Sequence, residues 1–172
     1  MSPPNPLESR SLSTGLAQRT IKNLDFIQKA HDCGEDVHIV MQMLNSMLGL
    51  LVFPVAKEDK FFKSFRSTKI SAQPDFGAVS KKIAGFPPLP SLTVSMFGNC
   101  ADLRRFFRRL RNAVSHRRLE FSGESHDLDA VIITFSDAPD RDSPIDWEIS
   151  LSANDLGRLC RFVANEVIRR HL

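Results

Sequence analysis

The sequence predicts a mainly α-helical fold: a bundle of about four main helices with a small antiparallel β insertion between the third helix and the last. Apolar residues recur at three- and four-residue steps before residue 116 and after residue 152, the period of helices buried on one side. Between these segments, short runs of β-branched and aromatic residues alternate with turn-prone segments. The 172 residues, 42% of them hydrophobic, fit one globular domain.

The first 13 residues contain three prolines and four serines, and they predict a flexible leader over 1–13, followed by a single domain over 14–172. A helical pattern begins at Thr14, and Gly34 is expected to end this helix near Cys33. Its apolar stripe consists of Ala17, Ile21, Leu24 and Ile27.

A second helix is predicted from Glu35 to Phe53, ended by Pro54. Its apolar residues cover more than half of the helix surface, so it should be the most buried element, with its methionines in the core. They are Val37, Val40, Met41, Leu44, Met47, Leu48 and Leu51. Lys57–Phe65 is expected to form a short amphipathic helix. The segment 67–98 contains four prolines, so we expect only short ordered pieces in it. Within it, Gly85–Pro90 is expected to be a rigid connector rather than a ligand for a partner protein.

The third long helix is predicted to start near Asn99 or Asp102 and to end close to His116. Its apolar stripe consists of Leu103, Phe106, Phe107, Leu110 and Val114, so Phe106 and Phe107 are expected in the core rather than stacked on bases. Three strands then form a meander within an insertion over about 117–151, at Leu119–Phe121, Ala130–Phe135 and Ile145–Leu151. A capping box from Ser152 to Asp155 starts a last helix that runs almost to Leu172.

Charge is distributed unevenly along the chain. Seven of the 15 arginines lie between residues 104 and 118, a segment without acids, whereas acids gather between residues 120 and 148. Cys33, Cys100 and Cys160 are odd in number and widely spaced, so we expect buried thiols rather than disulfides or zinc ligands. We expect no metal and no cofactor, and His126-Asp127 with Asp129 is expected to be a polar turn. Since neither a membrane span nor a signal sequence is evident, a cytoplasmic protein without membrane contact is expected.

The segment that points to chemistry lies at the end of the third helix. Asn112 and His116 are four residues apart and share a face, so the carboxamide is expected to orient the imidazole. Arg111 and Ser115 lie on the neighbouring face. An imidazole can move protons near neutral pH, and a guanidinium is a planar, permanently charged phosphate ligand. Together they are the minimum parts for metal-free cleavage of a phosphodiester, although this spacing also occurs by chance in solvated helices.

The segment Leu110–His116 resembles the signature of the HEPN superfamily, in which an arginine and a polar residue precede a histidine near a helix end. The segments Arg19–Ile27, Leu44–Pro54 and Trp147–Leu151 extend the resemblance to a branch found on plasmids and in mobile or defence contexts. Active members are metal-independent endoribonucleases in which two motif helices form one cleft. The resemblance therefore implies a homodimer through the motif helix, with Arg111, His116 and Asn112 as catalytic residues.

RNA is the expected partner, and an antitoxin or other protein is a possible second one. The residues expected to follow the RNA backbone are Arg104, Arg105, Arg108, Arg109, Ser115, Arg117 and Arg118. In the rival interpretation, some of these arginines pair with acids of the insertion or of a partner subunit. At the level of function, the alternative to a ribonuclease of toxin or defence type is a non-catalytic module that binds RNA or protein. A nucleotide-binding module is a third option.

Overall fold

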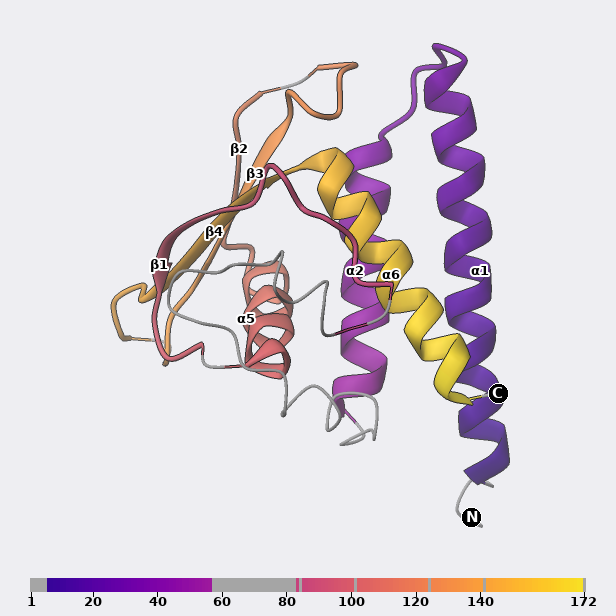
Figure 1. Cartoon of the computed structure of the whole chain (residues 1–172), viewed down its shortest axis with the longest axis horizontal. Coiled ribbons are helices and arrows are strands. Elements are labelled where there is room, and N and C mark those ends of the chain that lie inside the picture. The colour runs from indigo at the N-terminus through magenta and orange to yellow at the C-terminus, as the bar shows by residue number, and fades with distance from the viewer. Residues whose placement is uncertain are drawn as a thin grey trace.

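The computed structural model describes residues 6–56, 83, 85–100, 102–123, 125–140 and 142–171. These residues form α1 (Pro6–Asp32), α2 (Ile39–Ala56), β1 (Thr93–Phe97), α5 (Leu103–Ser115), β2 (Leu119–Phe121), β3 (Ile132–Asp137), β4 (Trp147–Ser152) and α6 (Ala153–His171). Helices α1, α2 and α6 pack together, and α5 lies between α2 and the sheet (Figure 1). The short helix expected over Lys57–Phe65 lies outside the described residues.

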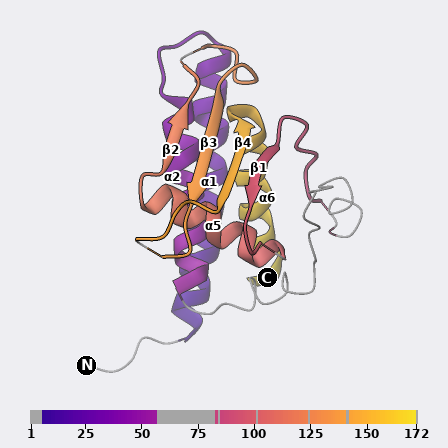
Figure 2. The ribbon, with the colours of Figure 1, turned by 90° about the vertical axis from the view of Figure 1, so that its left-hand side faces the viewer.

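The four strands form one antiparallel sheet in the order β1-β4-β3-β2, seen face-on in Figure 2. The expected meander of three strands is present as β2, β3 and β4. However, the sheet is larger than the small insertion predicted, because β1 precedes α5 in the chain and pairs with β4. Strand β1 is one of the short ordered pieces expected in the proline-containing segment 67–98, but its place in the sheet was not predicted.

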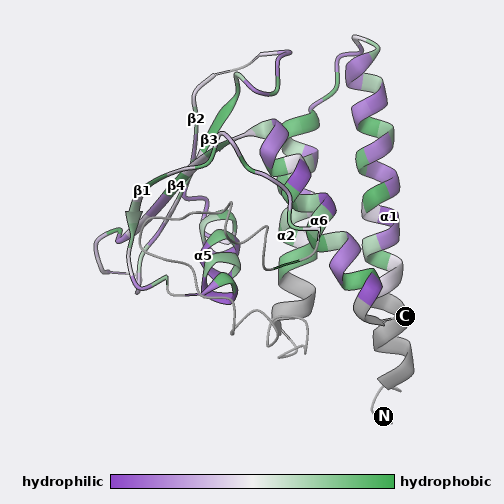
Figure 3. Cartoon of the chain, in the orientation of Figure 1, coloured by the Kyte–Doolittle hydropathy of each residue, from purple (hydrophilic) through white to green (hydrophobic). Residues whose placement is uncertain are grey.

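One face of the sheet packs against α5 and the other is polar. Phe135 and Ile149 point inward and are fully buried, and they belong to the same core as Phe106 and Phe107 of α5, as the sequence predicts for the two phenylalanines. On the outer face, the hydroxyl groups of Thr134 and Ser150 lie 2.8 Å apart. Figure 3 shows hydrophobic residues on β3 and α2 and hydrophilic residues along α1. The inner face of the sheet therefore supports α5 along one side of the helix.

Helix α1 begins at Pro6, within the segment 1–13 for which the sequence predicts a flexible leader, and not at Thr14. Proline has the backbone angle of a first helical residue and needs no donor there, which permits an early start without an apolar stripe. The end is as predicted: Gly34 adopts a φ of +80°, and the Glu35 N–H donates to the Ala30 carbonyl over 3.0 Å.

Helix α2 starts later and ends later than predicted, at Ile39 and Ala56. The Glu35 N–H is used to close the end of α1, and α2 continues two residues past Pro54, which was expected to end it. Met43 and Met47 are buried as expected, but Met41 is 51% exposed. None of the described helices is long and apolar enough to cross a membrane.

The N-terminus of α6 differs in one respect from the predicted capping box. The Ser152 hydroxyl accepts from the Asp155 N–H over 3.2 Å, as an N-cap does. The reciprocal bond is made by Ser91 instead, whose hydroxyl accepts from the Ser152 N–H at 2.8 Å and donates to the Asp155 carboxylate at 2.5 Å. Asp155 is thereby used to anchor the segment before β1, in which Phe86 packs edge-on against Phe162.

The thiols are predicted to differ in reactivity. Cys100 and Cys160 are buried as expected, but Cys33 is exposed at the end of α1. Burial raises the pKa of Cys160 to about 12, and burial raises the pKa of Cys100 to about 12 although Arg109 opposes the shift. Because the thiolate is the nucleophile, a higher pKa leaves less of it at about pH 8. An aromatic disulfide reagent should label Cys33 rapidly and the other two only in denaturant; fast labelling of Cys100 or Cys160 in the folded protein would contradict this.

Candidate functional site

Helix α5 has a defined start and a defined end. Asp102 is its N-cap and accepts from the Arg105 N–H over 2.8 Å, so the predicted start is confirmed. At the other end, the Arg118 N–H donates to the Ala113 carbonyl over 2.9 Å, which closes the helix as a Schellman motif does. This closure puts Arg117 at a φ of +56°, a left-handed conformation that costs a non-glycine residue about 1–2 kcal/mol.

His116 lies at this strained end, as the C-cap residue of α5. Its side chain is exposed, and no hydrogen bond or ion pair joins the ring to another residue in the described part of the chain. Both ring nitrogens are therefore available to a bound molecule, which is the condition for moving a proton to or from it.

Asn112 does not orient His116, so this part of the prediction is wrong. Its side-chain NH₂ group donates to Asp137 Oδ2 over 3.2 Å, and its oxygen accepts from Arg111 Nη2 over 2.6 Å. A carboxylate only accepts hydrogen bonds, so the nitrogen of the carboxamide faces Asp137 and the oxygen faces the guanidinium. Asn112 connects the sheet with Arg111 rather than with the imidazole.

Arg111 is half-buried, and its bond to Asn112 is its one hydrogen bond to the described residues. Its Nε is buried without a partner among them. A buried donor without a partner lowers the stability of the folded state by about 1–3 kcal/mol, so the unpaired Nε–H group of Arg111 requires an explanation. Most donors of the guanidinium thus make no bond to the described residues, as a ligand for an external anion requires.

Asp137 ends β3 and is 2% exposed. Besides Asn112, it binds Arg109 Nη1 at 3.2 Å and Arg118 Nη1 at 3.4 Å. Arg109 also donates to Asp146 Oδ2 over 3.0 Å. The rival interpretation is thus correct for Arg109 and Arg118, which pair with acids of the insertion. Sequence reasoning did not single out Asp137 or Asp146, and the one signal was the concentration of acids after α5.

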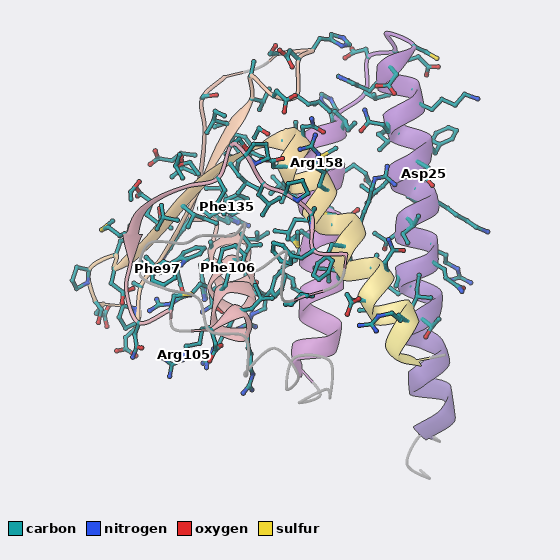
Figure 4. All side chains as sticks on the ribbon, viewed as in Figure 1. Asp25, Phe97, Arg105, Phe106, Phe135 and Arg158 are labelled. Carbon is teal, nitrogen blue, oxygen red and sulfur yellow. The ribbon has the colours of Figure 1, made fainter. Side chains whose placement is uncertain are left out.

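The other predicted RNA-binding residues fall into two groups. Arg105 donates to the backbone and side-chain oxygens of Asn99 at 3.0 and 2.5 Å, and Figure 4 shows it near the start of α5. The remaining four make no side-chain bond to the described residues, and three of them are exposed while Arg104 is half-buried. This group, which we call the free basic face, consists of Arg104, Arg108, Ser115 and Arg117.

A hollow lies away from α5, between the α1–α2 turn and the loop after β2. It has a volume of about 620 Å³, and none of the predicted site residues lines it. His31 Nε2 contacts the His126 carbonyl oxygen at 2.9 Å there, with the two rings stacked 4.8 Å apart.

Within the described residues, no group of three or more His, Cys, Asp or Glu is placed to hold a metal ion. Asp127 accepts from the Asp129 N–H over 3.0 Å, which makes this segment a polar turn.

Comparison with protein families matches residues 1–171 to the family described as HEPN pEK499 p136. No curated protein and no solved structure matches the chain. The family match covers all the described elements, including α5 with Arg111 and His116, and it confirms the resemblance found in the sequence. The chain therefore belongs to the HEPN superfamily, in its plasmid-associated branch.

Proposed function

We propose that this protein is a metal-independent endoribonuclease of HEPN type, with Arg111 and His116 as its catalytic residues. The observation that carries the proposal is the exposed imidazole of His116, unbonded within the described chain, at the end of a helix that also holds a guanidinium with unpaired donors. The free basic face, which lies on α5 and at Arg117 just after it, provides positive charge for an RNA backbone. The family membership supports the same chemistry.

In the proposed reaction, one His116 removes the proton from a ribose 2′-hydroxyl, and the 2′-oxygen attacks the adjacent phosphorus. The Arg111 guanidinium stabilises the negative charge that develops on the phosphoryl oxygens. The bond from phosphorus to the 5′-oxygen breaks, and a second imidazole returns a proton to that oxygen. Because one chain has a single histidine at this position, we propose that the second imidazole is His116 of another copy in a homodimer.

The alternative function, binding of RNA or protein without cleavage, has one observation in its favour. Asn112 is bonded to Asp137 and Arg111, so within the described residues nothing fixes the tautomer of the His116 ring. In the proposed dimer, the second subunit and the bound RNA would have to do so. A role as a toxin or defence effector, with an antitoxin as protein partner, is part of the proposal and follows from the family context.

The test is cleavage of a mixed RNA pool by the purified protein in EDTA. We expect fragments with a 2′,3′-cyclic phosphate or 3′-phosphate at one end and a 5′-hydroxyl at the other, since the 2′-oxygen is the nucleophile. Fragments with 5′-phosphates, or cleavage that requires added Mg²⁺, would refute the proposed mechanism. RNA binding without any cleavage would favour the alternative.

A further inference from the structure

Asp137 is a buried carboxylate, and its three side-chain partners among the described residues are all donors. They come from three places: Arg109 in the middle of α5, Asn112 one turn later, and Arg118 after the helix. Asp137 reaches them because it ends β3 on the face of the sheet that packs against α5. The carboxylate therefore ties the last turns of α5 and the chain after it to the sheet.

The direction of the Asn112 carboxamide follows from the chemistry of Asp137. The carboxylate has no proton to donate when ionised, so the carboxamide must present its NH₂ group to it. Its oxygen is then left on the opposite side, where it accepts from Arg111 Nη2 over 2.6 Å. Reversal of the carboxamide would put its NH₂ group against the guanidinium and its oxygen against the carboxylate, so two bonds would be lost together.

We propose that Asp137 is a positioning residue that sets the direction of the Arg111 guanidinium through Asn112. The consequence for catalysis rests on the proposed ribonuclease function, whereas the positioning itself is a property of this chain. A guanidinium half-buried beside a helix has several rotamers, and a phosphate ligand is effective only in the one that meets the transition state. The bond to Asn112 selects one of these rotamers.

The neighbouring acid provides a matched control. Asp146 also binds Arg109, with Arg109 Nη1 and Nη2 at 2.9 and 3.0 Å from its two oxygens, but it has no bond to Asn112. Asp146→Asn weakens an ion pair on the same arginine without changing the link between Asn112 and Arg111. Loss of charge near α5 and loss of positioning are thereby separated.

Asp137→Asn breaks the link because its new NH₂ group must face one of three donors. We expect it to lower kcat for RNA cleavage by roughly 10–100-fold with KM nearly unchanged, whereas Asp146→Asn leaves both near the wild-type values. Asn112→Ala removes the bond to Arg111 but keeps the buried carboxylate of Asp137, and it should lower kcat by a similar factor. This variant keeps the test valid if Asp137→Asn does not fold. Asp137→Asn and Asn112→Ala combined in one protein should lower kcat no further than either substitution alone, because both break the same contact.

The decisive variant is the exchange Asp137→Asn with Asn112→Asp. It places an acceptor against the new NH₂ group and keeps an acceptor for Arg111 Nη2, but it leaves Arg109 and Arg118 without the carboxylate at 137. If Asp137 acts by positioning, the exchange restores kcat by at least about tenfold over Asp137→Asn alone. If Asp137 only neutralises the two arginines, the exchange does not restore it, and the proposal is overturned.

An NMR measurement separates this inference from the proposed function. The side-chain amide signals of Asn112 and the Nε–H signal of Arg111 should shift in Asp137→Asn and stay in place in Asp146→Asn, whether or not the protein cleaves RNA. Shifted signals in a protein without RNA cleavage would support positioning and refute the ribonuclease. Unchanged signals and unchanged kcat in Asp137→Asn, in a protein that cleaves RNA, would refute positioning alone.

Discussion

Replacement of Trp147 by alanine is expected to lower the free energy of unfolding by about 3–5 kcal/mol. Trp147 is fully buried at the start of β4, and its ring lies edge-on to Phe106 of α5 with the centroids 6.0 Å apart. In the sheet it is paired with Asp137 on one side and with Phe97 on the other. Truncation of the Trp147 side chain leaves a large cavity where the sheet supports α5. Urea unfolding followed by circular dichroism measures the decrease in unfolding free energy.

Trp147→Phe is the matched control, because it keeps an aromatic ring against Phe106 and leaves a much smaller cavity. We expect a clearly smaller loss for this variant than for alanine, because fewer buried atoms are removed and less cavity remains. Equal losses for the alanine and phenylalanine variants, or a loss below about 1 kcal/mol for alanine, would mean that the contact between α5 and the sheet does not depend on this ring.

The second large effect concerns the proposed catalytic pair. His116→Ala is expected to lower the rate of RNA cleavage by about 100–10,000-fold, the usual loss when a general acid or base is removed. Arg111→Ala should cost about 100–1,000-fold, as for the removal of one donor that stabilises transition-state charge. Since His116 is exposed and unbonded within the described residues, its replacement should leave the unfolding midpoint unchanged.

Two further variants make this prediction specific. Arg111→Lys keeps the positive charge but loses the planar fork, so it should not restore the wild-type rate. His126→Ala removes an exposed histidine from the loop after β2, outside α5, and should cleave at the wild-type rate. Equal losses for His126→Ala and His116→Ala would point to a general effect of histidine removal, and wild-type rates for both would point to a contaminating nuclease.

Local patterns were sufficient to predict most helices and three of the strands. The Asp102 cap and the stripe that contains Phe106 and Leu110 are contained within a few residues of sequence, and the structure shows them as predicted. Two features depend on partners far along the chain. Strand β1 pairs with β4, which lies beyond α5 in the chain, and the Ser152 N–H is bonded by Ser91, 61 residues earlier.

The same distinction holds for the candidate site. The spacing of Arg111 and His116 and the arginine-rich surface of α5 could be found from the sequence. The partner of Asn112 could not, because Asp137 lies 25 residues away and faces α5 only through the register of β3 in the sheet. A helical spacing of four makes a bond between Asn112 and His116 possible, but a buried carboxylate is the stronger acceptor and takes the amide.

The most direct test of the central proposal is a single-turnover cleavage assay in EDTA, with wild-type protein and His116→Ala purified in parallel and acting on one defined single-stranded RNA. The proposed mechanism predicts cleavage by the wild type that leaves 5′-hydroxyl ends, and a rate at least about 100-fold lower for the variant. Cleavage at the same rate by both proteins, or no cleavage by either, would contradict it.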